Sequence, residues 1–136
     1  MIVVEKFGGS SVGNPERLKR VASRVAETYD AGNQVVVVVS AMGDTTDDLI
    51  ELSRKVNTSP GARELDMLLS TGEQISISML AMTLNAMGYP AISLTGRQAG
   101  FHTDGTFSKA KILSIDNQRV KKELDAGKIV VVAGFQ

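Results

Sequence analysis

The stretch Val35-Val36-Val37-Val38-Val39 consists of five consecutive valines, and it decides the class of fold. Valine favours extended backbone, and the run shows no alternation between apolar and polar side chains. A strand without that alternation is typical of a parallel sheet whose two faces are both covered by helices. We therefore expect residues 35–39 to form a strand that is buried on both faces of a parallel α/β sheet.

The segments on either side of this strand alternate between strand and helix patterns. From Ile75 onward, apolar residues occur almost all round one long helical segment, which predicts a central, buried helix. Residues 95–108 contain three glycines and are loop-like. The alternation predicts a layered α/β fold with right-handed crossovers. The further strands are expected at 2–7, 91–94, 112–115 and 129–133, and the helices at 15–31, 44–56, 63–87 and 118–125.

Length, charge and composition restrict the class of protein. The chain has 136 residues, enough for one domain, and its 15 basic and 15 acidic residues balance. A balanced charge provides no electrostatic surface for nucleic acid or an anionic membrane. Cysteine is absent, so thiolate metal sites are excluded, and the apolar runs are too short for a signal peptide or a bilayer span. We expect a cytoplasmic protein that acts on small molecules.

The run Lys6-Phe7-Gly8-Gly9-Ser10-Ser11-Val12-Gly13 follows the first predicted strand. Its glycines let backbone N–H groups approach an oxyanion, and Lys6 supplies a compact positive charge. A helix follows, with Asn14 as its expected N-cap and Pro15 at its first position. The run matches neither the P-loop nor the dinucleotide fingerprint. It predicts a phosphoryl-binding loop, and the alternative is a tight turn with Lys6 solvated.

A second polar segment, residues 40–47, follows the valine strand and carries a serine, two threonines and two aspartates. Because the carboxyl ends of parallel strands share one edge, this segment is expected on the same side of the sheet as the Lys6 loop. Its hydroxyls could bind a carboxylate or a phosphate, and Ser40 is the better candidate. The alternative is helix capping, in which Asp44 or Thr45 satisfies free N–H groups.

Glu73 lies on an apolar face of the long predicted helix, between Leu69 and Ile77 at four residues either way. A carboxylate on such a face is costly unless it is paired. Its partner could be a structural lysine or arginine, which is the common outcome, or the ammonium group of a substrate. Gly72 beside it would permit close approach of another segment.

The loop at residues 95–100 is glycine-flanked and lies on the expected ligand side, but its pattern is not specific. His102 is the only histidine in the chain. One histidine makes no metal site, and we expect His102 to be a surface residue and no metal to be bound directly by the protein.

Together these segments resemble aspartate kinase, a member of the amino acid kinase family. The resemblance runs the length of the chain in order. The matching segments are residues 6–12 (KFGGSSV), 37–47 (VVVSAMGDTTD), 62–73 (ARELDMLLSTGE), 95–100 (TGRQAG) and 131–136 (VVAGFQ).

The resemblance implies a fold, a reaction and a set of ligands. The implied fold is a three-layer α/β/α sandwich with a mainly parallel sheet, of which residues 1–136 would be the N-terminal, substrate- and phosphate-binding part. The implied reaction is phosphorylation of the side-chain carboxylate of L-aspartate by ATP, with Mg²⁺ held mainly through the nucleotide phosphates. That reaction is the first step of lysine, threonine and methionine biosynthesis.

The resemblance also implies roles for seven residues. One group would bind the transferring phosphate and the path along which it moves, and the other would hold aspartate, with Glu73 accepting the α-ammonium. The phosphate group comprises Lys6, Gly8, Gly9 and Ser10, and the aspartate group comprises Ser40, Thr46 and Glu73.

Relatives in this family continue with an Arg-Gly-Gly-Ser-Asp-like segment, a nucleotide-base pocket and regulatory ACT domains, none of which this sequence contains. We therefore expect the chain to be part of a longer enzyme, inactive alone, and able to form a homo-oligomer. A non-catalytic binding or interaction module derived from this fold is the alternative. A kinase for glutamate, acetylglutamate, carbamate or a nucleoside monophosphate is disfavoured by the segment at 40–47 and by Glu73.

Overall fold

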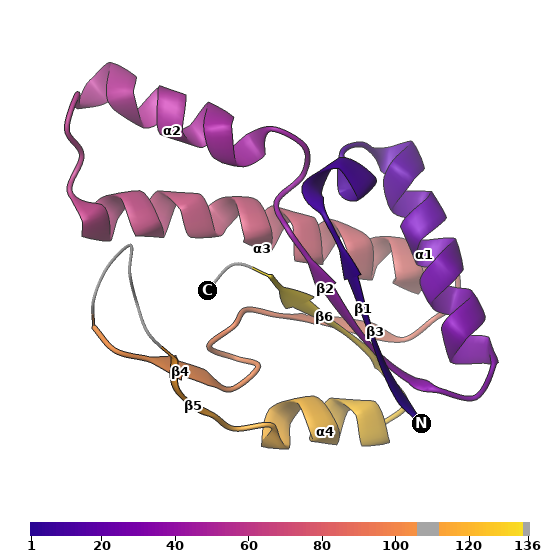
Figure 1. Ribbon diagram of the computed structural model, residues 1–136. Coiled ribbons are helices and arrows are strands. Elements are labelled where there is room, and N and C mark those ends of the chain that lie inside the picture. Colours follow the sequence, from indigo (N-terminus) through magenta and orange to yellow (C-terminus); the bar gives the residue numbers. More distant parts are fainter. Residues whose placement is uncertain (106–111, 135–136) are drawn as a thin grey trace.

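The computed structural model describes residues 1–105 and 112–134, and residues 106–111 and 135–136 lie outside the described part. Strands and helices alternate along most of the chain (Figure 1). The strands are β1 (Ile2–Phe7), β2 (Gln34–Val39), β3 (Ala91–Leu94), β4 (Phe101–Thr103), β5 (Ile112–Ile115) and β6 (Ile129–Ala133). The helices are η1 (Gly9–Val12, a 3₁₀ turn), α1 (Pro15–Asp30), α2 (Thr45–Val56), α3 (Ala62–Ala86) and α4 (Gln118–Asp125).

The main sheet has the strand order β1-β2-β6-β3, and every neighbouring pair in it is parallel. The register places Val3 beside Val35, Val37 beside Val131, and Leu94 beside Val132. The parallel α/β sheet predicted from the valine run is therefore confirmed.

Helices cover the two faces of the sheet unequally. On one face, α1 and α3 pack over a core that includes the fully buried Val35, Val37 and Leu80. On the other face, α4 packs against β6 and β3 through a smaller cluster that includes Leu124 and Val132. The sheet is thus the middle of three layers, as Figure 1 shows.

The expectation that the valine strand is buried on both faces is wrong for two of its five valines. Val35, Val37 and Val39 are fully buried, whereas Val36 and Val38 are only half-buried. The reason is that α4 lies over β6, so the β1–β2 half of that face has no helical cover within the described residues. On the neighbouring strand, Val4 is 64% exposed on the same face.

The long helix α3 is also less enclosed than predicted. Its inner face, with Ile77, Leu80 and Leu84, is buried against the sheet and α1. On its outer side, Ile75 and Met82 are 52% and 57% exposed. The C-terminal half of α3 thus packs on one side only, because α2 contacts the N-terminal half of the helix and does not extend over the rest of it (Figure 1).

The segment predicted as a loop at 95–108 contains the short strand β4. It pairs antiparallel with β5, so the strand predicted at 112–115 is confirmed but lies in a separate two-stranded sheet. Gly100, with φ of +103°, begins this hairpin, and its carbonyl accepts a hydrogen bond from the amide of Asp116 at 2.8 Å. A side chain at that φ would be strained, which explains the glycine.

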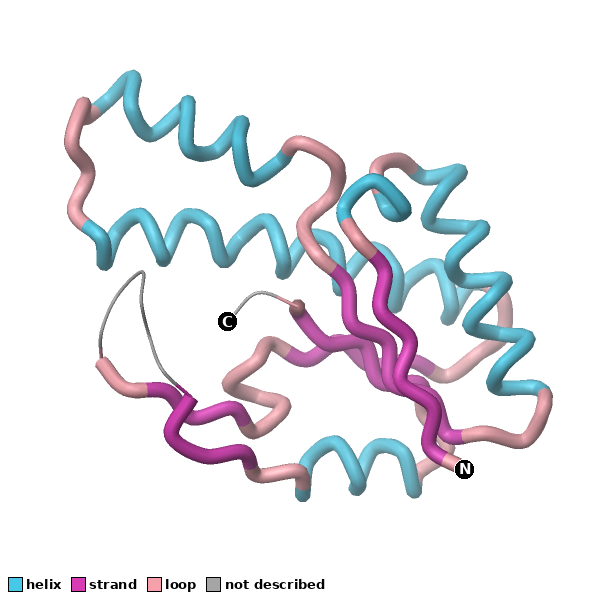
Figure 2. The backbone as a smooth tube through the Cα atoms, viewed as in Figure 1, coloured by secondary structure: helices cyan, strands magenta, loops and turns pink. Residues whose placement is uncertain are grey.

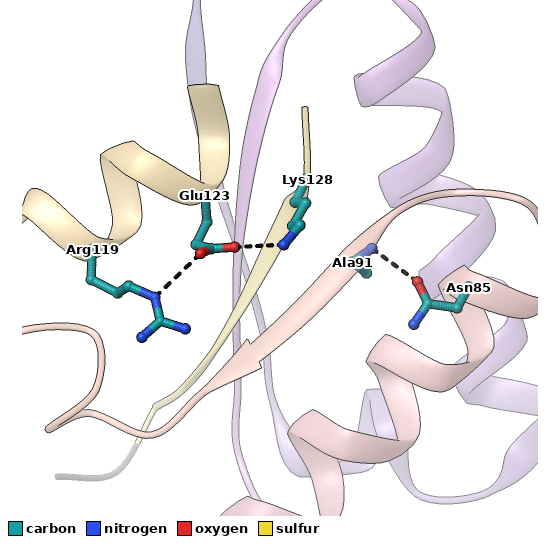
Figure 3. A network of polar contacts seen from close by, with 5 residues as sticks. All are labelled: Asn85, Ala91, Arg119, Glu123 and Lys128. Carbon is teal, nitrogen blue, oxygen red and sulfur yellow. Dashed lines mark hydrogen bonds and ion pairs between the residues drawn. The ribbon is translucent and has the colours of Figure 1, made fainter. Parts of the chain in front are cut away.

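A small polar network holds α4 near the start of β6, at the end of the sheet where the strands begin (Figure 3). The Glu123 carboxylate, 6% exposed, accepts from Lys128 Nζ at 3.0 Å and from Arg119 Nε at 3.3 Å. The hydrogen bond from Lys128 is the main cause that lowers the pKa of Glu123, and partial burial opposes it. In the same view Asn85 accepts from the amide of Ala91 at 2.9 Å and fixes the start of β3.

Candidate functional site

The carboxyl ends of three adjacent strands define the candidate site. Phe7 pairs in register with Val39, and Val39 pairs with Ala133, so β1, β2 and β6 end side by side. The loops after β1 and β2 lie next to each other and to the middle of α3 (Figure 2). Parallel α/β proteins bind ligands at this edge, because the loops and the helix N-termini converge there.

The loop after β1 is a 3₁₀ turn that lies tightly against the loop after β2. The carbonyl of Gly9 accepts from the amide of Gly43 at 2.9 Å. A Cβ atom added at Gly9 would lie 2.6 Å from the carbonyl oxygen of Ala41, far inside contact distance. Glycine is therefore required at position 9 by the approach of a second backbone.

Two contacts attach this turn to α1. Asn14 Oδ1 accepts from the amide of Arg17 at 2.9 Å, which confirms the predicted N-cap, with Pro15 following it. Arg17 also donates from Nη1 to the carbonyl of Ser10 at 2.7 Å. The turn is thus held from both sides, by α1 and by the loop after β2.

Lys6 lies in β1, on the face of the sheet opposite α1, and its side chain is exposed. Within residues 1–105 and 112–134 it has no hydrogen-bond or ion-pair partner through its ammonium group. A cation at the end of a strand, beside a turn with exposed backbone, is suited to an anionic ligand.

The loop after β2 does not cap α2 in the predicted way. Asp44 occupies the N-cap position but makes no side-chain hydrogen bond to the helix, and Thr45 Oγ1 donates to the carbonyl of Met42. The backbone of Asp44, at φ −92° and ψ 16°, is not the extended conformation from which a cap reaches the helix amides. Ser40 is half-buried beside the end of β1, and Thr46 is exposed in the first turn of α2.

Glu73 lies in α3 at the edge of the sheet and is 6% exposed. Its Oε2 is buried and has no hydrogen-bond partner within the described residues. Burial raises the pKa of the carboxyl group, and the backbone amides of Ala41 and Gly134 act in the opposite direction. Among the residues that the structure describes, no lysine or arginine pairs with Glu73, so the structural ion pair is not found.

Gly72 allows α3 to approach the loop after β2. A Cβ atom at this position would lie 3.2 Å from the Cβ of Ala41 and 3.2 Å from Cγ2 of Thr45. The close approach predicted from the sequence is confirmed. It brings Glu73 close to the loop after β2, whose backbone also contacts Gly9.

The structure joins two of the seven predicted site residues, Gly9 and Glu73, and gives no direct contact to Glu73 from three others. The backbone of Ala41 and Gly43 lies against Gly9, and the amide of Ala41 also acts on the carboxylate of Glu73. The structure thus joins Gly9 and Glu73 through one loop. Lys6, Ser40 and Thr46 share the edge by topology, but no hydrogen bond or ion pair joins them to Glu73 in the described part of the chain.

The structure also shows a cationic cavity that was not expected from the sequence. It has a volume of about 500 Å³ and lies beside the 3₁₀ turn, between β1 and α1. Its lining includes Ser10, Ser11 and three arginines of α1, at positions 17, 20 and 24. Their spacing of three and then four residues along a predicted helix is the signal that could have revealed them.

The remaining candidates from the sequence add no residue to the site. His102 is exposed, as expected. The described residues contain no group of three or more His, Cys, Asp or Glu side chains placed to hold a metal ion. In the same residues no helix is both long enough and apolar enough to cross a bilayer.

The fold is that of a parallel α/β domain, a class in which ligands bind beyond the carboxyl ends of the strands. The whole chain, residues 1–136, matches the model of the amino acid kinase family. The chain belongs to that family, as its resemblance to aspartate kinase implied.

Individual relatives are aspartate kinases. The chain is 57% identical over 135 residues to the aspartokinase of Bacillus sp. (strain MGA3), covering 99% of this chain and 33% of the relative. It therefore spans about a third of the length of the curated relatives that it matches.

Solved structures agree with the fold. A crystal structure of aspartate kinase from Synechocystis matches with a TM-score of 0.84 at 50% identity, over 100% of this chain and 22% of that one. Aspartokinase III of E. coli, in complex with aspartate and ADP, matches with a TM-score of 0.81 at 20% identity, over 99% of this chain and 41% of that one. The first comparison covers fold and sequence, and the second shows the fold alone.

Proposed function

We propose that this chain is the substrate- and phosphate-binding part of an aspartate kinase. In the longer enzyme it would take part in the ATP-dependent phosphorylation of the L-aspartate side chain to 4-phospho-L-aspartate, for lysine, threonine and methionine biosynthesis. The observation that carries the proposal is the buried carboxylate of Glu73 at the edge where the loops after β1 and β2 meet: within the described residues its Oε2 has no hydrogen-bond partner and no lysine or arginine pairs with it. The family and the aspartate kinase relatives support the same reaction.

Glu73 is assigned to the α-ammonium group of aspartate. A buried carboxylate is costly when one of its oxygens has no hydrogen bond and no cation faces it, as for Glu73 among the described residues, and an ammonium group placed against it would remove most of that cost. The amides of Ala41 and Gly134 already favour the charged form, which is the form that attracts a cation. Ser40, next to Ala41, and Thr46, in the first turn of α2, are assigned as hydroxyl ligands of the same substrate.

Lys6 is assigned to the transferring phosphoryl group. The side chain of aspartate, with a pKa of about 3.9, is already ionised at neutral pH, so the reaction requires no general base. The barrier is repulsion between that carboxylate and the phosphates of ATP, which cations and backbone N–H groups reduce. The exposed ammonium of Lys6 would supply the charge, with the backbone of Gly8, Gly9 and Ser10 along the phosphate path.

The remaining parts of the proposal concern the whole protein. ATP would be the phosphoryl donor, and Mg²⁺ would be held mainly by the nucleotide phosphates. Because the chain spans about a third of its curated relatives, we expect it to bind aspartate weakly and to lack turnover when isolated. We expect the longer enzyme to be cytoplasmic and able to form a homo-oligomer.

The test compares L-aspartate with succinate, which has the same two carboxylates but lacks the ammonium group. We expect aspartate, and not succinate, to shift the backbone NMR signals of Ala41 and Gly134 in the chain. Glu73→Gln should abolish that difference, whereas Glu64→Gln, at an exposed site of the same helix, should preserve it. Equal responses to the two ligands, or an unchanged response in Glu73→Gln, would contradict the assignment.

A further inference from the structure

Helix α3 carries a second buried polar group next to Glu73. Ser76 has no exposed surface, and its Oγ has no hydrogen-bond partner within the described residues. Positions three apart on a helix lie on the same side in successive turns, so Ser76 lies one turn further along α3 on the side of Glu73. In the described part, Glu5 Oε1 is the one other buried side-chain oxygen without a partner.

Within the described residues, the hydroxyl of Ser76 differs from those of two other helical residues that are buried or half-buried. A helical serine or threonine commonly donates to a carbonyl three or four residues earlier. Ser53 does so to Ile50 at 2.6 Å, and Thr83 does so to Met79 at 2.7 Å. A buried hydroxyl left without a partner destabilises the folded chain. Because Ser76 does not use the partner that its own helix offers, its hydroxyl is available to another acceptor.

We propose that Ser76 is a positioning residue for Glu73, and that its hydroxyl donates the hydrogen bond that Glu73 Oε2 lacks, directly or through one water molecule. The pairing satisfies both orphaned atoms, since a hydroxyl can donate and a carboxylate oxygen can only accept. Rotation of a single side-chain torsion redirects the serine hydroxyl.

The proposed bond has a consequence for the site. Burial raises the pKa of Glu73, and a protonated Glu73 would not attract an ammonium group. The amides of Ala41 and Gly134 lower the pKa of Glu73 and so oppose its protonation. Ser76 would add a third hydrogen-bond donor to the carboxylate, from within α3. The inference thus deepens the proposed function and rests on it for the identity of the bound cation.

A purely structural role is the competing explanation. A small residue at position 76 lets α3 approach the sheet, and alanine would serve that purpose equally well. Ser76→Ala therefore separates the two explanations, because it keeps the small volume and removes the donor. If packing alone mattered, this substitution would leave the titration of Glu73 unchanged.

The experiment follows the Glu73 carboxyl carbon by NMR during a pH titration of the ligand-free chain. We expect Ser76→Ala to move the pKa of Glu73 upward, and Ser76→Cys, with similar volume and a weaker donor, to move it in the same direction. Ser53→Ala is the matched control, because Ser53 is a buried serine that bonds within its own helix. Its titration curve for Glu73 should equal that of the unchanged chain.

Aspartate affinity provides a second measurement. Loss of one hydrogen bond to a charged group predicts about a tenfold weaker aspartate affinity in Ser76→Ala. In a Glu73→Gln background the same substitution should have no further effect. The pKa measurement needs no ligand, so a failure to bind aspartate would overturn the proposed function and leave this inference standing. An unchanged Glu73 titration in folded Ser76→Ala and Ser76→Cys would overturn the inference.

Discussion

The amide of Gly43 donates to the carbonyl of Gly9 over 2.9 Å, and this bond joins the loop after β1 to the loop after β2. The same contact brings the Cα of Gly9 so close to Ala41 that no side chain fits between them. The loop assigned to phosphate and the loop assigned to aspartate therefore form one unit. A change at either loop is expected to affect both.

Gly9→Ala should disrupt this unit. The new Cβ would lie 2.6 Å from the carbonyl oxygen of Ala41, and a backbone atom cannot move aside as a flexible side chain can. We expect a loss of about 1–3 kcal/mol in the free energy of unfolding, as for other overpacked sites. Urea denaturation followed by circular dichroism measures this loss.

Gly8→Ala is the matched control for that change. A Cβ atom at Gly8 would have no neighbour within 4 Å, and its backbone φ of −76° suits any residue. We expect a change within about 0.5 kcal/mol, which is usual for surface substitutions. Similar losses in the two variants would show that backbone flexibility, and not the contact with Ala41, requires glycine here.

Glu73→Gln should change how stability depends on pH. The pKa of Glu73 is raised in the folded chain, so the folded state holds its proton more tightly than the unfolded state. Stability from this group is then present below the unfolded value of 4.5 and is lost as pH rises through the folded value. Relative to the unchanged chain, Glu73→Gln should gain stability at neutral pH, with the difference shrinking below that value.

Thermal unfolding in buffers from acid to neutral pH measures this dependence. Added aspartate should reduce the advantage of the variant at neutral pH, because a bound ammonium group stabilises only the carboxylate. A constant difference between the two chains across the pH range would argue against titration of Glu73 as its cause.

Lys128→Met should produce the opposite pH dependence at the far end of the sheet. The hydrogen bond from Lys128 lowers the pKa of Glu123, so its stabilisation is present above the unfolded value of 4.5 and is lost as pH falls through the folded value. The variant should be less stable than the unchanged chain at neutral pH, and the difference should diminish in acid. Lys121→Met, at an exposed position of α4, is the control and should leave the pH profile unchanged.

Elements with local signals could be predicted from the sequence to within a residue or two. The start of α1 is fixed by Asn14 and Pro15, and the observed bond from the amide of Arg17 to Asn14 is the predicted cap. The strand β6 lies at the predicted residues because its apolar run reflects burial on both faces. The placement of Glu73 on a buried face also followed from helical spacing alone.

The predictions that failed depend on contacts distant in sequence. The exposure of Ile75 follows from where α2 lies, which no periodicity within α3 encodes. The missing cap at Asp44 follows from its backbone angles, in a turn whose preceding residue, Gly43, is bonded to the distant Gly9. The strand β4 has only three residues and depends on its pairing with β5.

Arg17→Met should loosen the 3₁₀ turn while leaving α1 in place. The guanidinium of Arg17 donates to the carbonyl of Ser10 at 2.7 Å from an exposed position, so we expect a loss of only about 0.5–1.5 kcal/mol in the free energy of unfolding. The sharper measurement is amide hydrogen exchange at Gly43, whose N–H bonds to the same turn and should exchange faster when the turn opens. Arg20→Met is the control, because Arg20 lines the same cavity but has no hydrogen bond or ion pair within residues 1–105 and 112–134. Equal exchange rates at Gly43 in both variants would mean that the contact with the loop after β2 holds the turn without help from α1.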